Sequence, residues 1–529
     1  MSGAGPFRLG ALLEGVADVD RAGLPAGALD VEVAEVRDDS RQVQPGDLFV
    51  AVPGTKIDAR QFVPDVVARG ARVLVIEGPA PTLFPGFAGV VVRVGSARRA
   101  LGVIAANRFG GAGALDLIAV TGTNGKTTTT FLLESILLAA GRSPGVIGTV
   151  NVRAAAWPGG AREASWTTPA PLVLQSVIGE MRAAGTTDVV LEATSQALEQ
   201  GRLEGCRFLV AGLTNVTQDH LDYHGTMDRY FDAKAILFER LMRDSGAVGV
   251  FFADQHEGQR MRARLRGARA LSVALTPDGA RAAGGAEVVV TRAAQSAAGW
   301  QLQIETPLGP LDIASPLVGG FNLSNLALAV GMAVGQGLDR DAITAGLARL
   351  GGVPGRLERV ANARGVLCLV DYSHTPDALE RAIAAVRPLT TGRVVVVFGC
   401  GGDRDNGKRS IMGQIAARDA DIAVVTSDNP RTEEPESILD MIVAGVRRES
   451  IPELDAAALA SAARGFHRES DRRSAIRRAA AACRPGDVLL IAGKGHEDYQ
   501  ILGKTKIHFD DREEASAALA AVTASQITT

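Results

Sequence analysis

From residue 117 onward, short runs of apolar, often β-branched residues alternate with longer stretches in which apolar residues recur at helical spacing. This alternation is typical of strand–helix units arranged around a parallel sheet. Strands are predicted at 118–121, 189–192, 208–213, 366–371, 394–398, 422–426 and 488–491. The clearest helices are predicted at 127–140 and 375–386. The pattern therefore predicts an α/β protein.

Two glycine-rich breaks, at 109–113 and 351–355, interrupt this pattern. Breaks of this composition commonly separate domains, and a length of 529 residues suits three or four folding units. We therefore predict three domains, at 1–112, 113–352 and 353–529. The stretch 282–299 is predicted to be a surface segment that lies outside the core.

Charge and composition exclude several classes of protein. Lys and Arg number 56 against 59 Asp and Glu, a net charge of −3, which is too balanced for a chain that coats nucleic acid. The uncharged stretch 313–338 is long enough to cross a bilayer but contains a proline and five glycines. We expect a buried helix there and no membrane insertion.

The cysteines indicate a reducing compartment. The chain has four cysteines, and none forms a C-x-x-C pair. No signal peptide is visible at the N-terminus. Together these features predict a cytoplasmic protein.

The strongest chemical signal is a phosphate-binding loop that follows the apolar strand 118–121 and opens a helix. Backbone N–H groups at such a helix start bind phosphates, a following lysine reaches the β- and γ-phosphates, and a hydroxyl coordinates Mg²⁺. Val120 stands where the usual loop has its first glycine, so this is a shortened variant. The predicted ATP-binding residues are Thr121, Gly122, Thr123, Asn124, Gly125, Lys126 and Thr127.

Acidic and histidine residues follow two other strands. Glu192 ends the strand 189–192, and a stretch containing His220 follows the strand 208–213. A carboxylate beside a phosphate-binding loop can hold the metal, directly or through water. A solvated carboxylate and a merely polar loop are the alternatives, and Lys234 alone would indicate a solvated helix face.

Four polar loops follow strands of the last segment, at 371–374, 399–405, 427–431 and 493–497. In an open parallel sheet, ligands bind in the crevice beyond the carboxyl ends of the strands. These loops mix arginines, which clamp carboxylates, with acids, which receive an ammonium group. The sequence therefore predicts a site for a zwitterion. The spacing of glycines at 399–402 does not fit a dinucleotide fingerprint.

These motifs resemble those of the Mur ligases, most closely the members that add the third amino acid of the peptidoglycan stem peptide. The likeness extends from about residue 39 to residue 512. Besides the phosphate-binding loop, it rests on motifs at 219–225, 322–325, 355–358, 371–376 and 402–405. The resemblance implies an N-terminal UDP-binding α/β domain, a central P-loop ATPase domain with a parallel sheet, and a Rossmann-like C-terminal domain.

The resemblance also assigns roles around the nucleotide. Residues on the adenine side, and residues that close onto the nucleotide, correspond to Asn322, Asn325, Arg356, Asp371 and His374.

Four residues are assigned to catalysis by the same resemblance, namely Lys126, Glu192, His220 and Lys234. Glu192, His220 and Thr127 would hold Mg²⁺, together with Lys234 in the form of a carbamate. CO₂ converts an amine into an anion that can face the metal, provided that the site desolvates the amine.

A third set matches residues that bind a UDP-linked muramoyl dipeptide, namely Ser40, Thr55, Lys56, Thr167, Thr168, Thr194, Gln200 and Arg202. Two positions depart from the family. Trp166 stands where relatives often have asparagine, and Thr194 replaces a serine while keeping its hydroxyl.

The motif Asp428-Asn429-Pro430-Arg431 bears on the amino acid that is added. The resemblance implies that members using meso-diaminopimelate carry this motif, whereas lysine-adding members lack the arginine. Diaminopimelate differs from lysine by a second carboxylate, which Arg431 can bind in a bidentate pair. The remaining matched ligands of the amino acid are Arg404, Gly493 and Glu497.

The resemblance thus implies an ADP-forming ligase that uses ATP and Mg²⁺ to add meso-diaminopimelate to UDP-MurNAc-L-Ala-D-Glu through an acyl phosphate, in peptidoglycan biosynthesis. A lysine-adding ligase and a folylpolyglutamate synthetase-like ligase remain alternatives. A nucleotide-driven switch that makes no amide is a third. We expect a monomer that binds these small molecules and no nucleic acid.

Overall fold

The computed structural model describes residues 6–54, 58–78, 87–113 and 115–527, with side chains up to residue 521. The chain forms two compact units. The first comprises residues up to 289 with 305–309 and 326–346, and the second comprises 290–304, 310–325 and 347 onward. These units do not test the three predicted domains, which stay a prediction.

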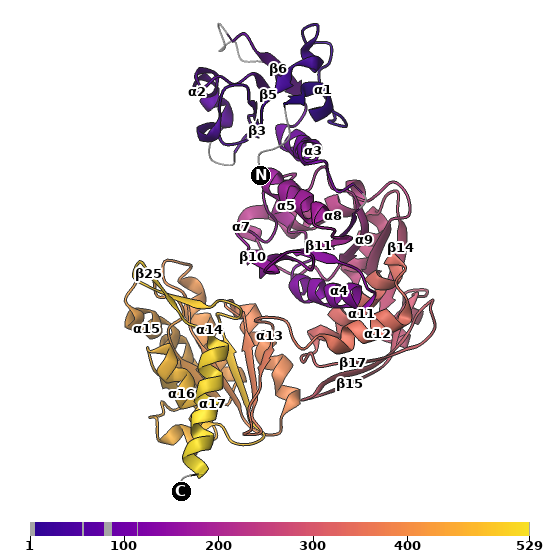
Figure 1. Ribbon diagram of the computed structural model, residues 1–529. Helices are drawn as coiled ribbons and strands as arrows, with labels where there is room; N and C mark the ends of the chain where they lie inside the picture. The colour runs from indigo at the N-terminus through magenta and orange to yellow at the C-terminus, as the bar shows by residue number, and fades with distance from the viewer. Residues whose placement is uncertain (1–5, 55–57, 79–86, 114, 528–529) are drawn as a thin grey trace. The chain divides into compact units, whose positions relative to one another are not determined.

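The N-terminal part of the first unit contains a parallel sheet in the order β3-β4-β5-β6 (Figure 1). Its strands are β3 (Val36–Arg37), β4 (Leu48–Val50), β5 (Val73–Glu77) and β6 (Val90–Val94). Side chains alternate between the two faces of a strand. Leu48 and Val50 accordingly pack with α1 (Leu9–Leu12) and α3 (Ala97–Phe109), whereas Phe49 packs with α2 (Val63–Ala68). A separate pair joins β1 (Phe7–Arg8) and β2 (Glu32–Val33).

The rest of the first unit is built on a second sheet in the order β10-β9-β8-β11-β7-β12-β13-β14, and the first two residues of β15 pair with β14. From β8 to β15 in this order, neighbouring strands are parallel, whereas β9 and β10 pair antiparallel. The bounds are β7 (Asp116–Thr121), β8 (Pro144–Ile147), β9 (Asn151–Ala154), β10 (Ala161–Glu163), β11 (Asp188–Glu192), β12 (Phe208–Leu213), β13 (Val248–Phe252), β14 (Arg269–Ala274) and β15 (Val288–Ser296).

Helices cover both faces of this sheet. Ala211 and Leu213 of β12 pack in one core with α5 (Pro171–Ala183), α8 (Met227–Arg240) and α9 (His256–Arg264). Gly212 between them faces the other way, where a Cβ would lie 2.4 Å from Met332 Sδ of α11 (Phe321–Gln336). That second face also carries α4 (Lys126–Ala139) and α12 (Arg340–Arg349), which pack on each other. Short helices are α6 (Ser195–Glu199), α7 (Leu221–His224) and α10 (Pro277–Ala282).

The second unit contains a sheet in the order β18-β19-β23-β20-β21-β22, parallel except for β18. Its strands are β18 (Glu358–Val360), β19 (Leu367–Asp371), β20 (Val394–Phe398), β21 (Ile422–Val425), β22 (Gly465–Arg468) and β23 (Val488–Ala492). The second unit also contains two antiparallel strand pairs, β16 (Gly299–Glu305) with β17 (Leu311–Ser315) and β24 (Tyr499–Leu502) with β25 (Thr505–His508).

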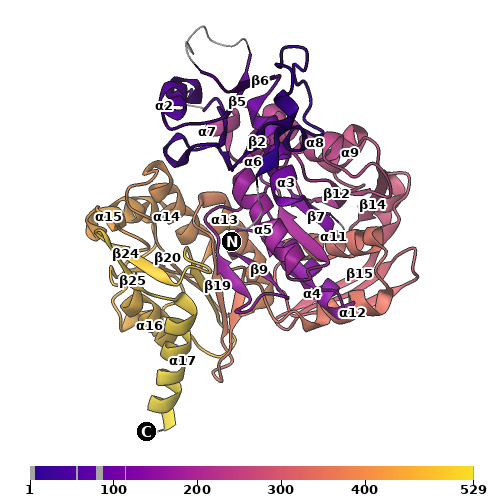
Figure 2. The ribbon, with the colours of Figure 1, turned by 45° about the horizontal axis from the view of Figure 1, so that its top comes forward.

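This sheet is the middle of three layers. Val394, Val396 and Phe398 of β20 pack toward α13 (Pro376–Val386), α14 (Gly407–Asp419) and α15 (Pro435–Val446). Val395 and Val397 face the other way, toward α16 (Arg472–Ala482) and α17 (Asp511–Ile527). Figure 2 shows the two sets of helices on opposite sides of the strands. Because side chains alternate between the two faces of a strand, successive residues of β20 lie in two different cores.

The predicted strands and helices are confirmed, with bounds that differ by at most two residues. The predicted buried helix within 313–338 is α11, which begins at Phe321 after the strand β17. No helix in the described ranges is both long and apolar enough to span a bilayer. The prediction for 282–299 was wrong, because Val288 and Val290 face the core and begin the strand β15.

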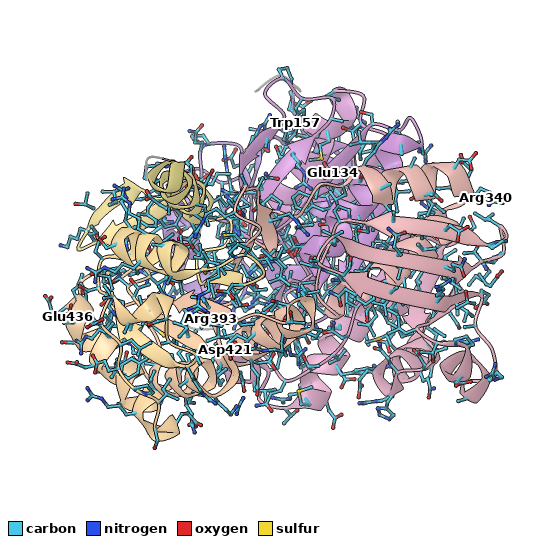
Figure 3. All side chains as sticks on the ribbon, turned by 90° about the horizontal axis from the view of Figure 1, so that it is seen from below. Glu134, Trp157, Arg340, Arg393, Asp421 and Glu436 are labelled. Atoms are coloured by element: carbon cyan, nitrogen blue, oxygen red, sulfur yellow. The ribbon has the colours of Figure 1, made fainter. Side chains whose placement is uncertain are left out.

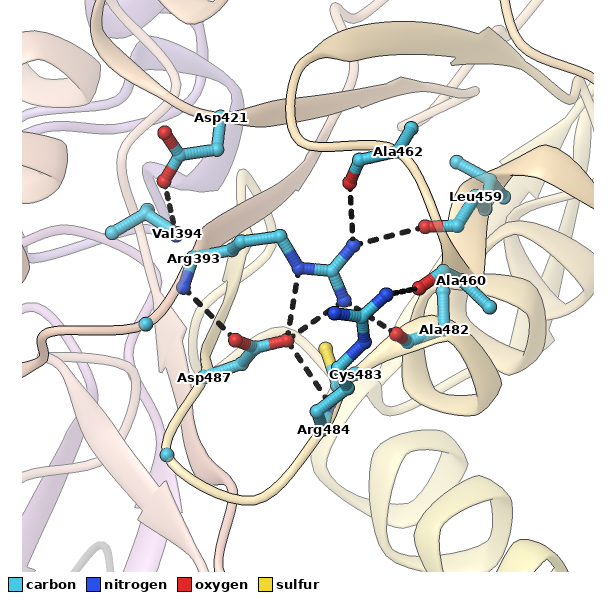
Figure 4. Close-up of polar contacts among 12 residues, drawn as sticks. Arg393, Val394, Asp421, Leu459, Ala460, Ala462, Ala482, Cys483, Arg484 and Asp487 are labelled. Atoms are coloured by element: carbon cyan, nitrogen blue, oxygen red, sulfur yellow. Dashed lines mark hydrogen bonds and ion pairs between the residues drawn. The ribbon is translucent and has the colours of Figure 1, made fainter.

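An ion cluster around the buried Asp487 lies at the amino ends of the strands of the second unit (Figures 3 and 4). Arg393 donates to Asp487 Oδ2 from Nε (3.2 Å) and Nη2 (2.8 Å), and its Nη1 donates to the carbonyl oxygens of Leu459 and Ala462. Asp421 accepts the backbone N–H of Val394 at 2.7 Å. Ligands of parallel sheets bind beyond the opposite, carboxyl ends. We therefore assign this cluster to stability.

Replacing Arg393 with methionine should lower the free energy of unfolding by about 3 kcal/mol, because the buried Asp487 would lose its partner. Urea denaturation measures this change. Arg381→Met is the control, because its ion pair with Asp377 is exposed and should contribute less than about 1 kcal/mol. Equal losses in the two variants would contradict a special role for the Arg393 cluster.

Candidate functional site

The phosphate-binding loop of the first unit connects β7 to α4, which begins at Lys126. Gly122 has a φ of 141°, and a Cβ at this position would lie 1.9 Å from Thr214 Oγ1, so no side chain fits. The backbone N–H of Asn124 donates to Asn215 Oδ1 at 3.1 Å, and Asn215 Nδ2 donates back to the Asn124 carbonyl at 3.0 Å. The segment after β12 therefore fixes the shape of the loop at the start of a long helix.

Glu192, at the end of β11, is a buried carboxylate that faces the helix start. Its two oxygens accept the Thr127 hydroxyl, each at 3.1 Å. They also accept the backbone N–H of Thr149 at 2.8 Å and its hydroxyl at 3.0 Å. A carboxylate with two hydroxyl groups beside it is a set of oxygen ligands of the kind that Mg²⁺ prefers. Sequence reasoning missed Thr149, although it follows β8 at the same edge of the sheet.

Lys234 of α8 is buried, and its Nζ lies 3.0 Å from the Gly122 carbonyl oxygen. Lys126 Nζ donates to the same oxygen at 2.9 Å. Burial lowers the pKa of Lys234 well below its ordinary value, and the charge of Lys126 lowers it further. The structure thus brings the two predicted catalytic lysines together and favours a neutral amine on Lys234, the form that reacts with CO₂.

His220 opens α7 with a φ of 52°. Its imidazole is about half exposed, with Nε2 3.6 Å from Asp219 Oδ2 and its ring 6.3 Å from that of Tyr230. In the described part of the chain, no three His, Cys, Asp or Glu side chains lie close enough together to hold a metal ion by themselves. A metal here would need the Thr127 hydroxyl and phosphate oxygens as further ligands, and the role of His220 stays a prediction.

Several residues predicted to bind the muramoyl dipeptide lie together at this edge of the sheet. Arg202 donates to Gln200 Oε1 at 2.6 and 3.0 Å and to the Thr168 carbonyl at 2.9 Å. The Thr168 hydroxyl approaches that of Thr194 at 3.2 Å, and the Thr167 hydroxyl lies 3.1 Å from that of Thr149. Burial lowers the pKa of Arg202. These hydroxyl groups and the Arg202 guanidinium group form a network that can hydrogen-bond to a polar ligand.

Trp166 adjoins this network and is 64% exposed. The guanidinium carbon of Arg202 lies 5.4 Å from the centre of its ring. An exposed indole beside polar groups is a surface on which an amphipathic ligand can pack.

In the N-terminal part of the first unit, Ser40 begins a short 3₁₀ turn. Asp39 caps this turn, because its Oδ1 accepts the backbone N–H of Arg41 at 3.0 Å. Its Oδ2 also forms an ion pair with Arg41 Nη2 at 2.8 Å. These hydrogen bonds lower the pKa of Asp39 to about 2. The predicted ligands Thr55 and Lys56 lie outside the described residues.

In the second unit, the residues predicted around the nucleotide occupy two places. Asn322 and Asn325 are buried at the start of α11, where Asn325 Nδ2 donates to Asn322 Oδ1 at 2.9 Å and Asn322 Nδ2 to the Val318 carbonyl at 2.7 Å. Asp371 ends β19 and accepts the backbone N–H of Leu357 at 2.7 Å. Burial raises the pKa of Asp371.

Beside Asp371, the Arg356 guanidinium carbon lies 5.1 Å from the centre of the Tyr372 ring. His374 contacts the Tyr372 carbonyl through Nδ1 at 2.8 Å. Burial lowers the pKa of His374, which favours the neutral imidazole. The nucleotide roles of these residues stay predictions.

The loops predicted to bind an amino acid meet at the carboxyl ends of β21 and β23. Asn429 Nδ2 donates to Glu497 Oε2 at 3.1 Å. A Cβ on Gly493 would lie 3.6 Å from Asp428 Oδ2. Asp428 Oδ1 is buried and has no hydrogen-bond partner among the described residues, although Lys494 lies 3.5 Å away. An unsatisfied buried carboxylate oxygen suits an incoming ammonium group.

Two arginines approach Gly401, in the loop after β20. Arg431 Nη1 donates to the Gly402 carbonyl at 2.8 Å, and its backbone is held by the Ile501 carbonyl at 3.1 Å. A Cβ on Gly401 would lie 2.9 Å from Arg431 Nη1 and 3.8 Å from Arg404 Cγ, so both arginines approach this glycine. The charge of Arg431 acts on Glu497, so one guanidinium group and two carboxylates act together here, whereas the substrate contact of Arg404 stays a prediction.

Comparison with known families gives three matches along the chain. Residues 32–109 match the Mur ligase family catalytic domain, 120–333 the Mur ligase middle domain, and 355–495 the Mur ligase glutamate ligase domain.

Individual relatives agree with these matches. The chain is 46% identical over 517 residues to the UDP-N-acetylmuramoyl-L-alanyl-D-glutamate–2,6-diaminopimelate ligase of Prochlorococcus marinus, covering 94% of this chain and 96% of the relative. It is 45% identical over 509 residues to the Gloeobacter violaceus protein of the same name, with the same coverage. A solved structure of a ligase of that name covers 93% of this chain and 95% of its own, at 31% identity and a TM-score of 0.67.

Proposed function

This chain belongs to the Mur ligase family, and we propose that it joins meso-2,6-diaminopimelate to the D-Glu side-chain carboxylate of UDP-MurNAc-L-Ala-D-Glu, with cleavage of ATP to ADP and phosphate. The observation that carries this proposal is the cluster of Asp428 and Glu497, with the charge of Arg431 acting on Glu497. Such a site complements an ammonium group and a nearby carboxylate. Phosphate release that requires both the UDP-linked dipeptide and diaminopimelate tests the proposal.

In the first step, a D-Glu carboxylate oxygen attacks the γ-phosphorus of ATP, and ADP leaves. The N–H groups at the start of α4 and the Lys126 ammonium stabilise the charge spread over the transferring phosphoryl group. Glu192 and Thr127, with His220 and a carbamylated Lys234, would hold Mg²⁺. When bound, this ion supplies positive charge at the β- and γ-phosphate oxygens.

In the second step, the free amine of diaminopimelate attacks the carbonyl carbon of the acyl phosphate. A tetrahedral intermediate forms, loses a proton from nitrogen and collapses to amide and phosphate. Asp428 and Glu497 would hold the other ammonium group, and Arg404 and Arg431 would orient the nearby carboxylate. Buried side chains such as Asn429 keep these groups in fixed positions.

Replacing Arg431 with alanine should raise the KM for diaminopimelate by about 30-fold and remove the preference for diaminopimelate over lysine, because a charged hydrogen bond to the second carboxylate is lost. Mass spectrometry of products from an equal mixture of the two amino acids measures this preference. Arg431→Lys is the matched variant, which keeps the charge but not the bidentate geometry. An unchanged preference in Arg431→Ala would remove this residue from the specificity argument.

Adding the UDP-linked dipeptide should shift the tryptophan emission to shorter wavelength, because ligand covers Trp166 while Trp157 and Trp300 are already buried. Fluorescence titration gives the shift and the affinity. Trp166→Phe should lose the shift, and Trp300→Phe should keep it. A shift that persists in Trp166→Phe would place the ligand elsewhere.

Two further parts of the proposal concern the state of the protein. ATP and UDP-linked sugars are cytoplasmic metabolites, so we place the reaction in the cytoplasm. The monomer expected from the sequence stays a prediction, which light scattering tests.

A further inference from the structure

The Lys494 side chain, directly after β23, has no exposed surface and contacts the loops assigned to the amino acid. Its Nζ donates to Asn429 Oδ1 at 3.0 Å and to the Tyr499 carbonyl. The same atom lies 3.5 Å from Asp428 Oδ1 and 3.8 Å from Glu497 Oε2. One buried ammonium therefore contacts three residues that the proposed function places around the substrate.

The neighbouring buried cation does not compete for this role. Arg472 and Asp511 are both fully buried and form a bidentate pair, with distances of 2.7 Å from Nε and 2.6 Å from Nη2. The remaining hydrogen bonds of Arg472 go to backbone carbonyls. Because Asp511 balances this arginine, Lys494 is the cation in direct contact with Asp428 and Glu497.

Asp428, Glu497 and Lys494 together carry a net charge of −1 when all three are ionised. An ammonium group of the substrate would neutralise this charge. We propose that Lys494 is a positioning residue that holds Asp428 and Glu497 in place for the amino-acid substrate. This inference rests on the proposed function and adds a residue that the family motifs did not assign.

The ionisation of Glu497 gives a direct readout of this role. Burial and the charge of Asp428 raise the pKa of Glu497, whereas Lys494, the Asn429 hydrogen bond and Arg431 lower it. Besides the cluster residues Asp428, Glu497 and Lys494, the charged and titratable groups that face it are Arg431, Arg472, Asp511, Tyr372, Tyr499, His374 and Cys400. Without Lys494, the pKa of Glu497 rises, so the carboxylate is protonated at a higher pH.

Lys494→Met should therefore raise the KM for diaminopimelate about tenfold and move the acid limb of kcat/KM for diaminopimelate to higher pH. The KM for ATP should change less than twofold. Lys506→Met is the matched control, because Lys506 also packs on Tyr499, at 3.9 Å from the ring centre, but is exposed. This control should keep the wild-type KM and pH profile.

Lys494→Gln is the second variant, since it retains a donor for Asn429 but no charge, and it should show the same shift of the acid limb. An acid limb at the wild-type pH in both variants would overturn the proposal, as would equal rises in the KM for ATP and for diaminopimelate. Failure of both variants to fold would also overturn it, because Lys494 would then serve folding alone. If wild-type protein forms no product with diaminopimelate, the proposed function fails instead.

Discussion

Replacing Lys126 with methionine should lower kcat by about 10³-fold, because the transferring phosphoryl group loses its cation in the phosphate-binding loop. Lys126 Nζ lies 2.9 Å from the carbonyl oxygens of Gly122 and Thr123, at the start of α4. The expected loss is large because the loop amides alone carry only partial positive charges. Steady-state phosphate release with all three substrates measures it.

Lys504→Met is the control for Lys126→Met, because Lys504 is an exposed lysine in the turn between β24 and β25. It should keep wild-type kcat. Binding of the UDP-linked dipeptide to Lys126→Met, followed by tryptophan fluorescence, should also be retained, which separates a catalytic loss from unfolding. A kcat within tenfold of wild type in Lys126→Met would contradict the assignment of this loop to phosphoryl transfer.

Replacing Lys234 with alanine should lower kcat by about 10²- to 10³-fold, and short carboxylic acids such as acetate should restore part of the activity. The Nζ atoms of Lys234 and Lys126 both hydrogen-bond to the Gly122 carbonyl oxygen. The lowered pKa of Lys234 favours the neutral amine, which is the form that reacts with CO₂. The carbamate would place a negative charge where the alanine variant has space for an added carboxylate. Activity assays across acetate concentrations measure the restoration.

Two controls distinguish a carbamate from a merely structural lysine. Lys234→Arg keeps a positive charge, but its guanidinium group stays protonated and does not react with CO₂ to give a carbamate. This variant should therefore be inactive and should not respond to acetate. Wild-type protein depleted of CO₂ should lose activity and regain it with bicarbonate. Activity of wild-type protein that is independent of bicarbonate, with no restoration of Lys234→Ala, would contradict the proposed modification.

The sequence predicts those parts of the fold and the site that are encoded within one short segment. The strands 118–121 and 394–398 are visible because their apolar runs are continuous, and both are confirmed. The phosphate-binding loop has its glycines, lysine and threonine within seven residues, so its position before α4 was also predictable.

Contacts between distant segments could not be predicted in this way. Thr149 contacts Glu192 across 43 residues, and Lys494 contacts Asn429 across 65. The local sequence does not show these pairings, because they depend on which strands become neighbours in the sheet. The strand β15 was missed for a related reason: Val288 and Val290 alternate correctly, but the rest of the strand is largely polar and exposed.

Mass spectrometry of the reaction product tests the central claim most directly. Purified protein is supplied with ATP, Mg²⁺, UDP-MurNAc-L-Ala-D-Glu and an equal mixture of meso-diaminopimelate and lysine. The account predicts one UDP-linked product that contains diaminopimelate, formed together with ADP and phosphate. ATP hydrolysis without any UDP-linked amide would contradict it, and a product that contains lysine in equal amount would contradict the specificity assigned to Arg431.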